Sequence, residues 1–287
     1  MTGIINWDEL WKATHKRGFN HHGKDLVSHW DERAQEFNKR VMKNKERAKS
    51  QVAMLGLTAE ETVLDVGAGT GRLAIPMARM AKSVTALDQS TGMLSCLQEN
   101  MAAEGIKNIC PIQKNWQDVA GDELEKHDVV ISSNSLGVYD LKAALTKMDS
   151  LAKRAVYIFT FADGKRDDGF RQFMRQCKEG QVGGHGRHGR SEIGPAGYLI
   201  IYNLLADMGI LADIKIMQWN SKEQYKSLDE AVAEWKGMHE LPEEKEPQLR
   251  EFLSQRLVKE GDGLVLNRHH KQVLISWQKG EGLSALG

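Results

Sequence analysis

The stretch that decides the fold is Thr62-Val63-Leu64-Asp65-Val66-Gly67-Ala68-Gly69-Thr70-Gly71-Arg72. It begins with a short, mostly apolar run, which is typical of a strand buried in a sheet. Glycines then follow at alternate positions, and glycine lets a backbone turn tightly and approach a ligand closely. A tight strand-to-helix turn without a ligand is the alternative. The carboxyl end of a strand, however, is where open α/β sheets bind ligands.

The same order of elements repeats along the chain. Short apolar runs alternate with helical patterns, which indicates a doubly wound α/β fold with a parallel sheet and crossover helices. The expected strands are Thr62–Val66, Ser83–Leu87, Ile109–Gln113, Asp128–Ser132, Ala155–Phe161, Ile214–Trp219 and Gln272–Trp277. The expected helices lie near Arg72–Met80, Gly92–Glu104, Leu141–Leu151 and Tyr198–Met208.

Length and composition are those of one sizeable core. The chain has 287 residues, of which 41% are hydrophobic, and we expect a single domain over residues 1–287. Its additions are a helical arm at residues 1–50 and insertions at residues 162–195 and 220–265. We expect the arm to act as a lid and the insertions to cover the carboxyl ends of the strands.

Charge and cysteine usage exclude several classes of protein. Lys plus Arg and Asp plus Glu number 39 each, so no overall positive field attracts a polyanion, and nucleic acid is not the favoured partner. The cysteines Cys96, Cys110 and Cys177 have no paired spacing, which favours a reducing compartment. No run approaches the roughly 18 apolar residues of a membrane span. We therefore expect a soluble cytoplasmic protein.

The spacing of the glycines selects the ligand. A dinucleotide fingerprint reads G-x-G-x-x-G and holds a pyrophosphate at the helix N-terminus. Here the spacing is G-x-G-x-G, with Arg72 at the following position. Asp65 precedes the loop and would repel a pyrophosphate, whereas a cofactor that carries an amine and a sulfonium would be attracted there. A nicotinamide-dependent dehydrogenase would need the other spacing.

Asp88 is the second marker of the ligand. It closes the strand Ser83–Leu87, and a carboxylate at that place can accept hydrogen bonds from both ribose hydroxyls of an adenosine. Because NAD-binding proteins share this feature, Asp88 supports an adenosine without naming the cofactor.

These motifs together resemble the class I S-adenosylmethionine (SAM)-dependent methyltransferases. Val63–Gly71 resembles the first motif of that family, and Val84–Ser90 followed by Met93 and Leu94 resembles the second. Asp128–Leu136 resembles the fourth strand and the loop under the methyl group. The resemblance covers roughly residues 60 to 160. It implies SAM as cofactor and a mostly parallel, seven-stranded sheet of order 3-2-1-4-5-7-6 with the last strand antiparallel.

The resemblance also implies which residues contact SAM. Asn115 and Trp116 stand where many members carry an Asp-Ala pair near the adenine, so Asn115 could bond the exocyclic amine, and Trp116 could line the pocket or belong to the core. In the arm, Trp30 and Arg33 share a helix face, and Trp30 could stack on the adenine or pack on the sheet. The expected cofactor residues are Asp65, Gly67, Ala68, Gly69, Gly71, Asp88, Gln89, Met93, Asn115, Trp116, Ser133, Trp30 and Arg33.

The catalytic residues are less well marked. Methyl transfer from a sulfonium is an in-line displacement, so the enzyme must chiefly align donor and acceptor. A general base is needed only where the acceptor holds a proton. Asn134, Ser135 and Tyr139 are the candidates near the methyl group, although Tyr139 could equally be a packing residue at a helix start. His21 and His22, with His29, could supply a base if the arm covers the site; surface placement is the alternative.

The loop after the fourth strand narrows the chemical class of the methyl acceptor. Ser132-Ser133-Asn134-Ser135 lacks the Asn/Asp-Pro-Pro-Tyr/Phe motif that resemblance to amino-methylating nucleic-acid and glutamine enzymes would require. The Pro-Cys pair of cytosine C5 enzymes is absent as well. We therefore predict a small-molecule substrate, anionic or planar. The rivals are an RNA or protein methyltransferase, with Arg166–Arg190 as its basic strip, and a non-catalytic SAM-binding protein.

Two further segments keep several interpretations. The run Gly183–Arg190 is rich in Gly, His and Arg and could bind an anionic substrate group, a metal ion, or nothing until a ligand orders it. No Cys or carboxylate has ligand spacing nearby, so we predict no metal site. The charged segment Leu228–Lys259 is expected to be a helical cover over the cleft, and a homodimer contact is its alternative.

Overall fold

The computed structural model describes residues 5–15, 26–42, 45–120, 122–162, 173, 177, 197–239 and 241–280. The chain divides into two compact units. The first comprises residues 1–162, 187–215 and 273–287, and the second comprises residues 163–186 and 216–272. We expected a single domain in which 220–265 is an insertion; these residues fall within the second compact unit, and the single domain stays a prediction. The placement of that segment over the active site stays a prediction.

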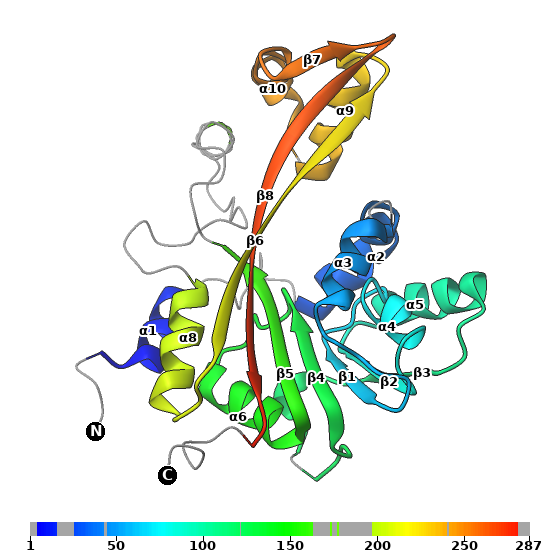
Figure 1. The fold of residues 1–287 in the computed structure, drawn as a ribbon. Helices are drawn as coiled ribbons and strands as arrows, with labels where there is room; N and C mark the ends of the chain where they lie inside the picture. Colours follow the sequence, from blue (N-terminus) through cyan, green and yellow to red (C-terminus); the bar gives the residue numbers. More distant parts are fainter. Residues whose placement is uncertain are drawn as a thin grey trace. The chain divides into compact units, whose positions relative to one another are not determined.

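The strands form a mixed sheet in the order β3-β2-β1-β4-β5-β8-β6, and β7 pairs with β8 (Figure 1). Its strands are β1 (Thr62–Val66), β2 (Ser83–Asp88), β3 (Ile109–Gln113), β4 (His127–Ser133), β5 (Ala152–Phe161), β6 (Asp213–Tyr225), β7 (Leu257–Glu260) and β8 (Gly263–Gln278). The strands β1 to β5 are parallel to their neighbours, and β8 is antiparallel to β5. The strand β7 was not expected. If it is left out and β8 is counted as the seventh strand, the observed order is the predicted order 3-2-1-4-5-7-6.

The centre of the sheet is covered on both faces, which is why β1 is almost wholly apolar. Its residues Val63–Val66 are all buried, as expected for a parallel strand between two layers of helices. Val66 lies beside Leu87 of β2 and beside Ser132 of β4 in the parallel register. The ends of three neighbouring strands therefore meet at one edge.

The helices α1 to α8 belong to the first unit, and α9 and α10 belong to the second (Figure 1). They are α1 (Trp7–His15), α2 (Leu26–Met42), α3 (Lys45–Ala53), α4 (Ala74–Ala78), α5 (Thr91–Glu104), α6 (Leu141–Leu151), α8 (Gly197–Asp207), α9 (Leu228–His239) and α10 (Glu246–Ser254), with short 3-10 turns at Trp116–Asp118 and Glu243–Lys245. In α6 the apolar side chains recur at helical spacing and are buried. The Asp140 side chain caps its start by accepting a hydrogen bond from the Ala143 amide at 2.8 Å.

The N-terminal arm does not form one layer. Helix α1 packs on α8 and α6, and the indole of Trp11 is buried there and donates a hydrogen bond to the Val138 carbonyl at 2.8 Å. Helix α2 lies along α5 instead, and α3 packs on α4. The described helices of the arm therefore pack on several other helices of the first unit, and its role as a lid stays a prediction.

The second unit has a core of its own around Trp235. Its indole donates a hydrogen bond to the Tyr225 hydroxyl at 3.0 Å, and that hydroxyl donates to Glu223 at 3.0 Å. The other buried members of this core include Leu241, Leu249, Phe252, Leu253 and Leu266. The helical character predicted for Leu228–Lys259 is confirmed as far as Ser254, whereas Leu257–Lys259 belong to the strand β7. Helix α9 ends before Pro242. Pro247 lies in the first turn of α10, where proline is tolerated.

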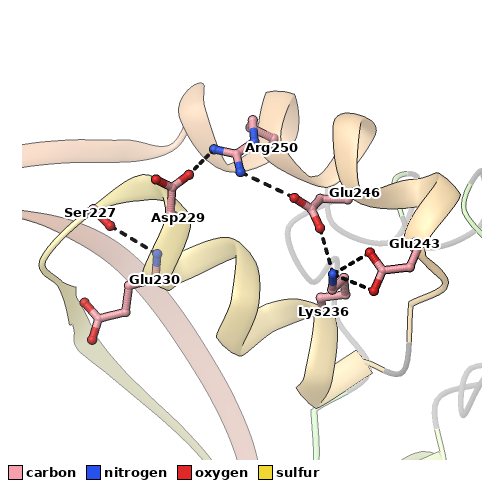
Figure 2. Close-up of polar contacts among 7 residues, drawn as sticks. All are labelled: Ser227, Asp229, Glu230, Lys236, Glu243, Glu246 and Arg250. Carbon is pink, nitrogen blue, oxygen red and sulfur yellow. Dashed lines mark hydrogen bonds and ion pairs between the residues drawn. The ribbon is translucent and has the colours of Figure 1, made fainter.

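Ion pairs join the outer faces of α9 and α10 (Figure 2). Lys236 Nζ lies 2.8 Å from a Glu243 carboxylate oxygen and 2.7 Å from Glu246, and Arg250 lies 2.5 Å from Asp229 and 3.4 Å from Glu246. Exposed pairs of this kind contribute little stability each. Burial around Trp235 therefore dominates the stability of this unit. No helix in the described part of the chain is long and apolar enough to cross a membrane.

Candidate functional site

The glycine loop after β1 can only be built from glycine at its key positions. Gly67, Gly69 and Gly71 have φ angles of 74°, 56° and 85°, a region that favours glycine. The amides of Gly67 and Ala68 donate to the Leu87 carbonyl at 2.8 and 3.0 Å, which ties the loop to the end of β2. A Cβ on Gly67 would lie 2.3 Å from Ser135 Cβ. The loop is thus held against both neighbouring strands.

Asp88 is oriented by the backbone on both sides. One carboxylate oxygen accepts from the Gly69 amide at 2.8 Å, and the other accepts from the Ser90 amide at 2.9 Å. Burial raises the pKa of the Asp88 carboxyl, although these backbone hydrogen bonds oppose the shift. Each oxygen of a carboxylate has two acceptor sites, so this one can still accept hydroxyl groups of a ligand.

Asp65 is a buried carboxylate at the end of β1. Burial raises its pKa to about 7, while the positive charge of Arg72 lowers the pKa and the negative charge of Asp88 raises it. No side chain or amide in the described part of the chain donates a hydrogen bond to this carboxylate. An ionised group in that state is strongly destabilised. A cationic group of a ligand would therefore be attracted to it.

Arg72 links the loop to two other elements. Its Nη2 donates to Ser133 Oγ at 3.0 Å, after β4, and its Nη1 donates to Gln51 Oε1 in α3. Burial lowers the pKa of the guanidinium to about 10, and the negative charge of Asp65 opposes that change. Arg72 was predicted only to exclude a dinucleotide, and the sequence did not predict these contacts.

The loop after β4 is fixed by its serines and an unusual backbone. Asn134 is the one non-glycine residue with positive φ among those described, at 56°, and asparagine tolerates that region better than most residues. Its amide donates to the Phe159 carbonyl at 2.8 Å. Ser135 Oγ donates to the Val66 carbonyl at 2.6 Å and lies 2.7 Å from Ser132 Oγ. Ser133 and Asn134 are therefore held beside the end of β1.

Tyr139 is placed differently from the two preceding candidates. Its amide donates to Gln117 Oε1 at 3.2 Å, and Lys12 Nζ of α1 lies 5.8 Å from its ring centroid. The ring is about half exposed.

His21 and His22 lie outside the described residues, as does the run 183–190. His29 lies in α2, with its ring in edge contact with Trp30.

Asn115 and Trp116 follow β3 as expected, but they are used structurally. The Asn115 side chain accepts a hydrogen bond from the Gln117 amide at 3.0 Å and so begins the 3-10 turn. The Trp116 indole belongs to the buried cluster that includes Val119 and Leu145. Its Nε1 has no hydrogen-bond partner in the described part of the chain. Of the two alternatives for Trp116, the core placement is the one observed.

Helix α2 lies against the glycine loop and α5. The Asp31 carboxylate accepts hydrogen bonds from Ser90 Oγ at 2.6 Å and from the Gly92 amide at 2.8 Å. A Cβ on Gly69 would lie 4.0 Å from the Phe37 ring. Trp30 stands edge-to-face with Phe37 at 5.6 Å, and both pack on the buried cluster that contains Met93. Asp31 and Phe37 were not among the predicted site residues.

The remaining predicted residues lie close by. Gln89 is between Asp88 and Ser90, and its amide also hydrogen-bonds the Asp88 carboxylate. The Met93 amide donates to Ser90 Oγ at 3.0 Å. Arg33 is in α2, three residues after Trp30. No group of three or more metal-ligating side chains is found within the described residues.

Comparison with known proteins identifies one domain of the chain. Residues 63–155 match a family model described as a methyltransferase domain. The chain contains a class I SAM-dependent methyltransferase domain. The matched part of this methyltransferase domain begins in β1 and ends in β5, so it includes the glycine loop, Asp88 and the loop after β4. SAM is its cofactor.

Three known proteins are similar to all or part of this chain. An uncharacterised protein of Haemophilus influenzae is 27% identical over 278 residues, which cover 95% of this chain and 96% of the relative. The ribosomal RNA small subunit methyltransferase A of Desulforapulum autotrophicum is 26% identical over 128 residues, 43% of this chain and 45% of the relative. The YcgJ protein from Bacillus subtilis superposes with a TM-score of 0.55 at 15% identity, covering 83% of this chain and 100% of YcgJ. That superposition shows the fold.

Proposed function

We propose that this protein transfers the methyl group of SAM to a small molecule, with SAM held between the ends of β1 and β2. The observation that carries the cofactor site is the bond between Gly69 and Asp88, at 2.8 Å. It joins the glycine loop to the carboxylate of the neighbouring strand. Asp65, at the end of β1, completes a site with two carboxylates and a close backbone approach.

The two carboxylates have separate tasks in this proposal. Asp88 accepts hydrogen bonds from the ribose hydroxyls, because its orientation is already set by the amides of Gly69 and Ser90. Asp65 attracts the positive end of the cofactor, and a nearby positive charge would lower its raised pKa. Gln89, Met93 and Asn115 remain proposed neighbours of the adenosine.

The loop after β4 forms the acceptor side of the site. When bound, SAM supplies an electrophilic methyl group on its sulfonium. The protein's own contribution is to hold the acceptor in line and to exclude water. Asn134 is suited to this task because its backbone is fixed by Phe159 and its side chain is exposed. We propose Asn134 as a residue that positions the acceptor.

Two observations support a small molecule as the acceptor. The chain carries equal numbers of basic and acidic residues, so it has no general affinity for a polyanion. The loop Ser133-Asn134-Ser135 contains no proline. The partial match to a ribosomal RNA methyltransferase favours RNA as the second candidate, and salt-sensitive RNA binding would support that candidate. The basic strip 166–190 lies largely outside the described residues.

The cofactor site is tested by isothermal titration of SAM and S-adenosylhomocysteine into wild type, Asp88→Ala and Asp207→Ala. Asp207 is an exposed carboxylate of α8 and serves as the matched control. We expect wild type and Asp207→Ala to bind both ligands equally and Asp88→Ala to lose at least tenfold in affinity. Equal affinity of all three proteins would contradict the role of Asp88. No binding by wild type would contradict the proposal as a whole.

The acceptor is tested with methyl-labelled SAM and a cell extract that has been separated into small-molecule, RNA and protein fractions. We expect label to be transferred to the small-molecule fraction by wild type and not by Asp88→Ala. Label in the RNA or protein fraction alone would overturn the small-molecule assignment. The small-molecule product can then be identified by mass spectrometry.

A further inference from the structure

A shallow groove with a volume of about 500 Å³ runs along the outer face of α6, beside the first turn of α1. Its residues from α6 share one face of the helix, because they recur at spacings of three and four positions. They are Lys142, Ala143, Thr146, Lys147 and Ser150, and Asp140 and Asp8 of α1 border them. Most of these side chains are exposed, whereas the opposite face of α6 is buried. We call this surface the α6 groove.

Two polar groups in the α6 groove lack a complementary partner. Asp8 Oδ1 is buried and accepts no hydrogen bond within the described residues, although Oδ2 of the same carboxylate lies 2.6 Å from Lys12 Nζ. Lys147 Nζ donates to the carbonyls of Trp116 and Gln117 at 2.7 and 3.3 Å, and burial lowers the pKa of its ammonium group. A buried acceptor gains stability from a donor, and a partly buried ammonium from a carboxylate.

The chain leaves β8 at the last turn of α6. The Trp277 indole donates to Asp149 Oδ1 at 2.8 Å, and Lys279 Nζ lies 2.6 Å from Asp149 Oδ2. Asp149 directly precedes Ser150 of the α6 groove. The described residues end at Gly280. The residues that follow Gly280 therefore start beside one end of the groove.

We propose that residues 281–287 dock in the α6 groove. These seven residues are Glu281-Gly282-Leu283-Ser284-Ala285-Leu286-Gly287, and they lie outside the described residues. An extended chain spans about 3.3–3.6 Å per residue, so seven residues reach about 23–25 Å. Helix α6 has 11 residues and is about 16 Å long. The segment is thus long enough to follow the whole groove.

The chemistry of the segment matches that of the groove. Glu281 supplies the carboxylate that Lys147 lacks among the described residues. Leu283 and Leu286 pack on the aliphatic stems of the groove lysines, which cover apolar surface readily. The backbone amides of an extended segment are donors that need acceptors, and one of them bonds Asp8 Oδ1. The docked segment ties the end of β8 to α6.

The test measures how fast an acetylating reagent modifies individual lysines in the full chain and in a chain that ends at Gly280. Lys142 and Lys147 report on the groove, and Lys107 is the matched control, since it is exposed and does not line the groove. We expect the groove lysines to react about threefold or more faster without residues 281–287, because a tethered segment covers its site at a high effective concentration. Lys107 should react alike in both proteins.

A second measurement keeps the chain whole, so it does not depend on how the shortened chain folds. Ser284→Cys is combined with Ala143→Cys of the groove or, as the matched control, with Ala103→Cys at an exposed position of α5. Cys110, the exposed native cysteine, is replaced by serine in both proteins. Under mild oxidation we expect the disulfide to Ala143→Cys to form about tenfold faster than the disulfide to Ala103→Cys.

Three outcomes would overturn the inference. Groove lysines that react equally fast with and without residues 281–287 would leave the groove uncovered. Disulfides that form at equal rates at the two positions would mean that the segment does not favour α6. Faster labelling after deletion of residues 2–4, with no effect of deleting 281–287, would assign the groove to the residues before α1 instead.

Discussion

The Asp31 carboxylate of α2 accepts a hydrogen bond from Ser90 Oγ at 2.6 Å, and the amide of the same serine donates to Asp88 at 2.9 Å. Asp31, a residue of the N-terminal arm, is therefore connected to Asp88 through a single intervening residue, Ser90. Asp31 also accepts from the Gly92 amide, in the first turn of α5, where amides lack partners within the helix. The arm and the proposed ribose site are joined at Ser90.

Asp31→Ala is expected to weaken S-adenosylhomocysteine binding by about three- to tenfold and to lower the free energy of unfolding by about 1–2 kcal/mol, because it removes a cap of α5. Titration calorimetry and urea unfolding measure the two effects. The control is Gln35→Ala in the same helix, since the exposed Gln35 side chain forms a hydrogen bond with the surface residue Glu99 at 3.4 Å and, among the described residues, with no other side chain. If both variants bind alike, the arm does not act on the cofactor site through Asp31.

Gly67→Ala is expected to abolish detectable binding of S-adenosylhomocysteine. The new methyl group would meet Ser135 at 2.3 Å, and the loop would have to move. Gly105→Ala is the matched control, because Gly105 has a similar φ of 66° but open space around its Cβ position. It should be destabilised by about 1 kcal/mol through backbone strain alone and should still bind. Equal affinity of the two variants would show that strain, and not the contact with Ser135, matters.

Asp65 should make the stability of the ligand-free protein depend on pH. Burial raises its folded-state pKa from an ordinary 3.8 to about 7, so the folded protein holds a proton that the unfolded chain has released. The stability contributed by that proton is present below about pH 4 and is lost as the pH rises to about 7. Urea unfolding at several pH values should show a steeper decline for wild type than for Asp65→Asn.

The same shift predicts proton release on ligand binding. The ammonium group of S-adenosylhomocysteine would favour the ionised form of Asp65 and lower its pKa, so binding between about pH 5 and 7 should release protons. Calorimetry in two buffers with different ionisation enthalpies measures the number released. Asp65→Asn should release fewer protons than wild type. Identical release by the two proteins would place the ligand's positive charge elsewhere.

Leu249→Ala tests whether the second unit is energetically separate. Leu249 is fully buried in the core around Trp235, and loss of such a side chain destabilises a protein by about 2–5 kcal/mol. Hydrogen exchange should rise in α9 and α10, while affinity for S-adenosylhomocysteine should stay within about twofold of wild type. Lys236→Gln, which removes exposed ion pairs only, is the control and should change exchange little. Faster exchange throughout β1 to β5 would show that the two units unfold together.

Much of the fold could be predicted because the deciding signals are local. An apolar run such as Thr62–Val66 and the helical spacing in Leu141–Leu151 lie within a few residues of one another, and both elements were found with nearly the predicted bounds. The long extension of β6 was not predicted. Residues such as Asn220, Lys222 and Glu223 are polar, and they pair in a strand only because β8 lies beside them.

In the candidate site, too, some residues could be predicted from local sequence and others could not. Asp65, Gly69 and Asp88 were predicted because their positions at strand ends follow from the sequence, and the bond from Gly69 to Asp88 brings them together. The contacts of Asp31 with Ser90 and of Arg72 with Ser133 join residues 59 and 61 positions apart. No motif marks such pairs, since only the packing of helices on the sheet decides them. A conformation such as that of Asn134 is likewise a product of its tertiary surroundings.

Residues 216–272 leave the first unit on β6 and return to it on β8, and these strands are neighbours in the sheet. The two ends of the segment are therefore adjacent, so that the segment could be removed or replaced as a unit. A short turn, or the corresponding segment of a homologue, could join β6 to β8 without altering the strand order that carries the glycine loop and Asp88. Domains whose two ends lie close together are the kind that tolerate insertion into another domain.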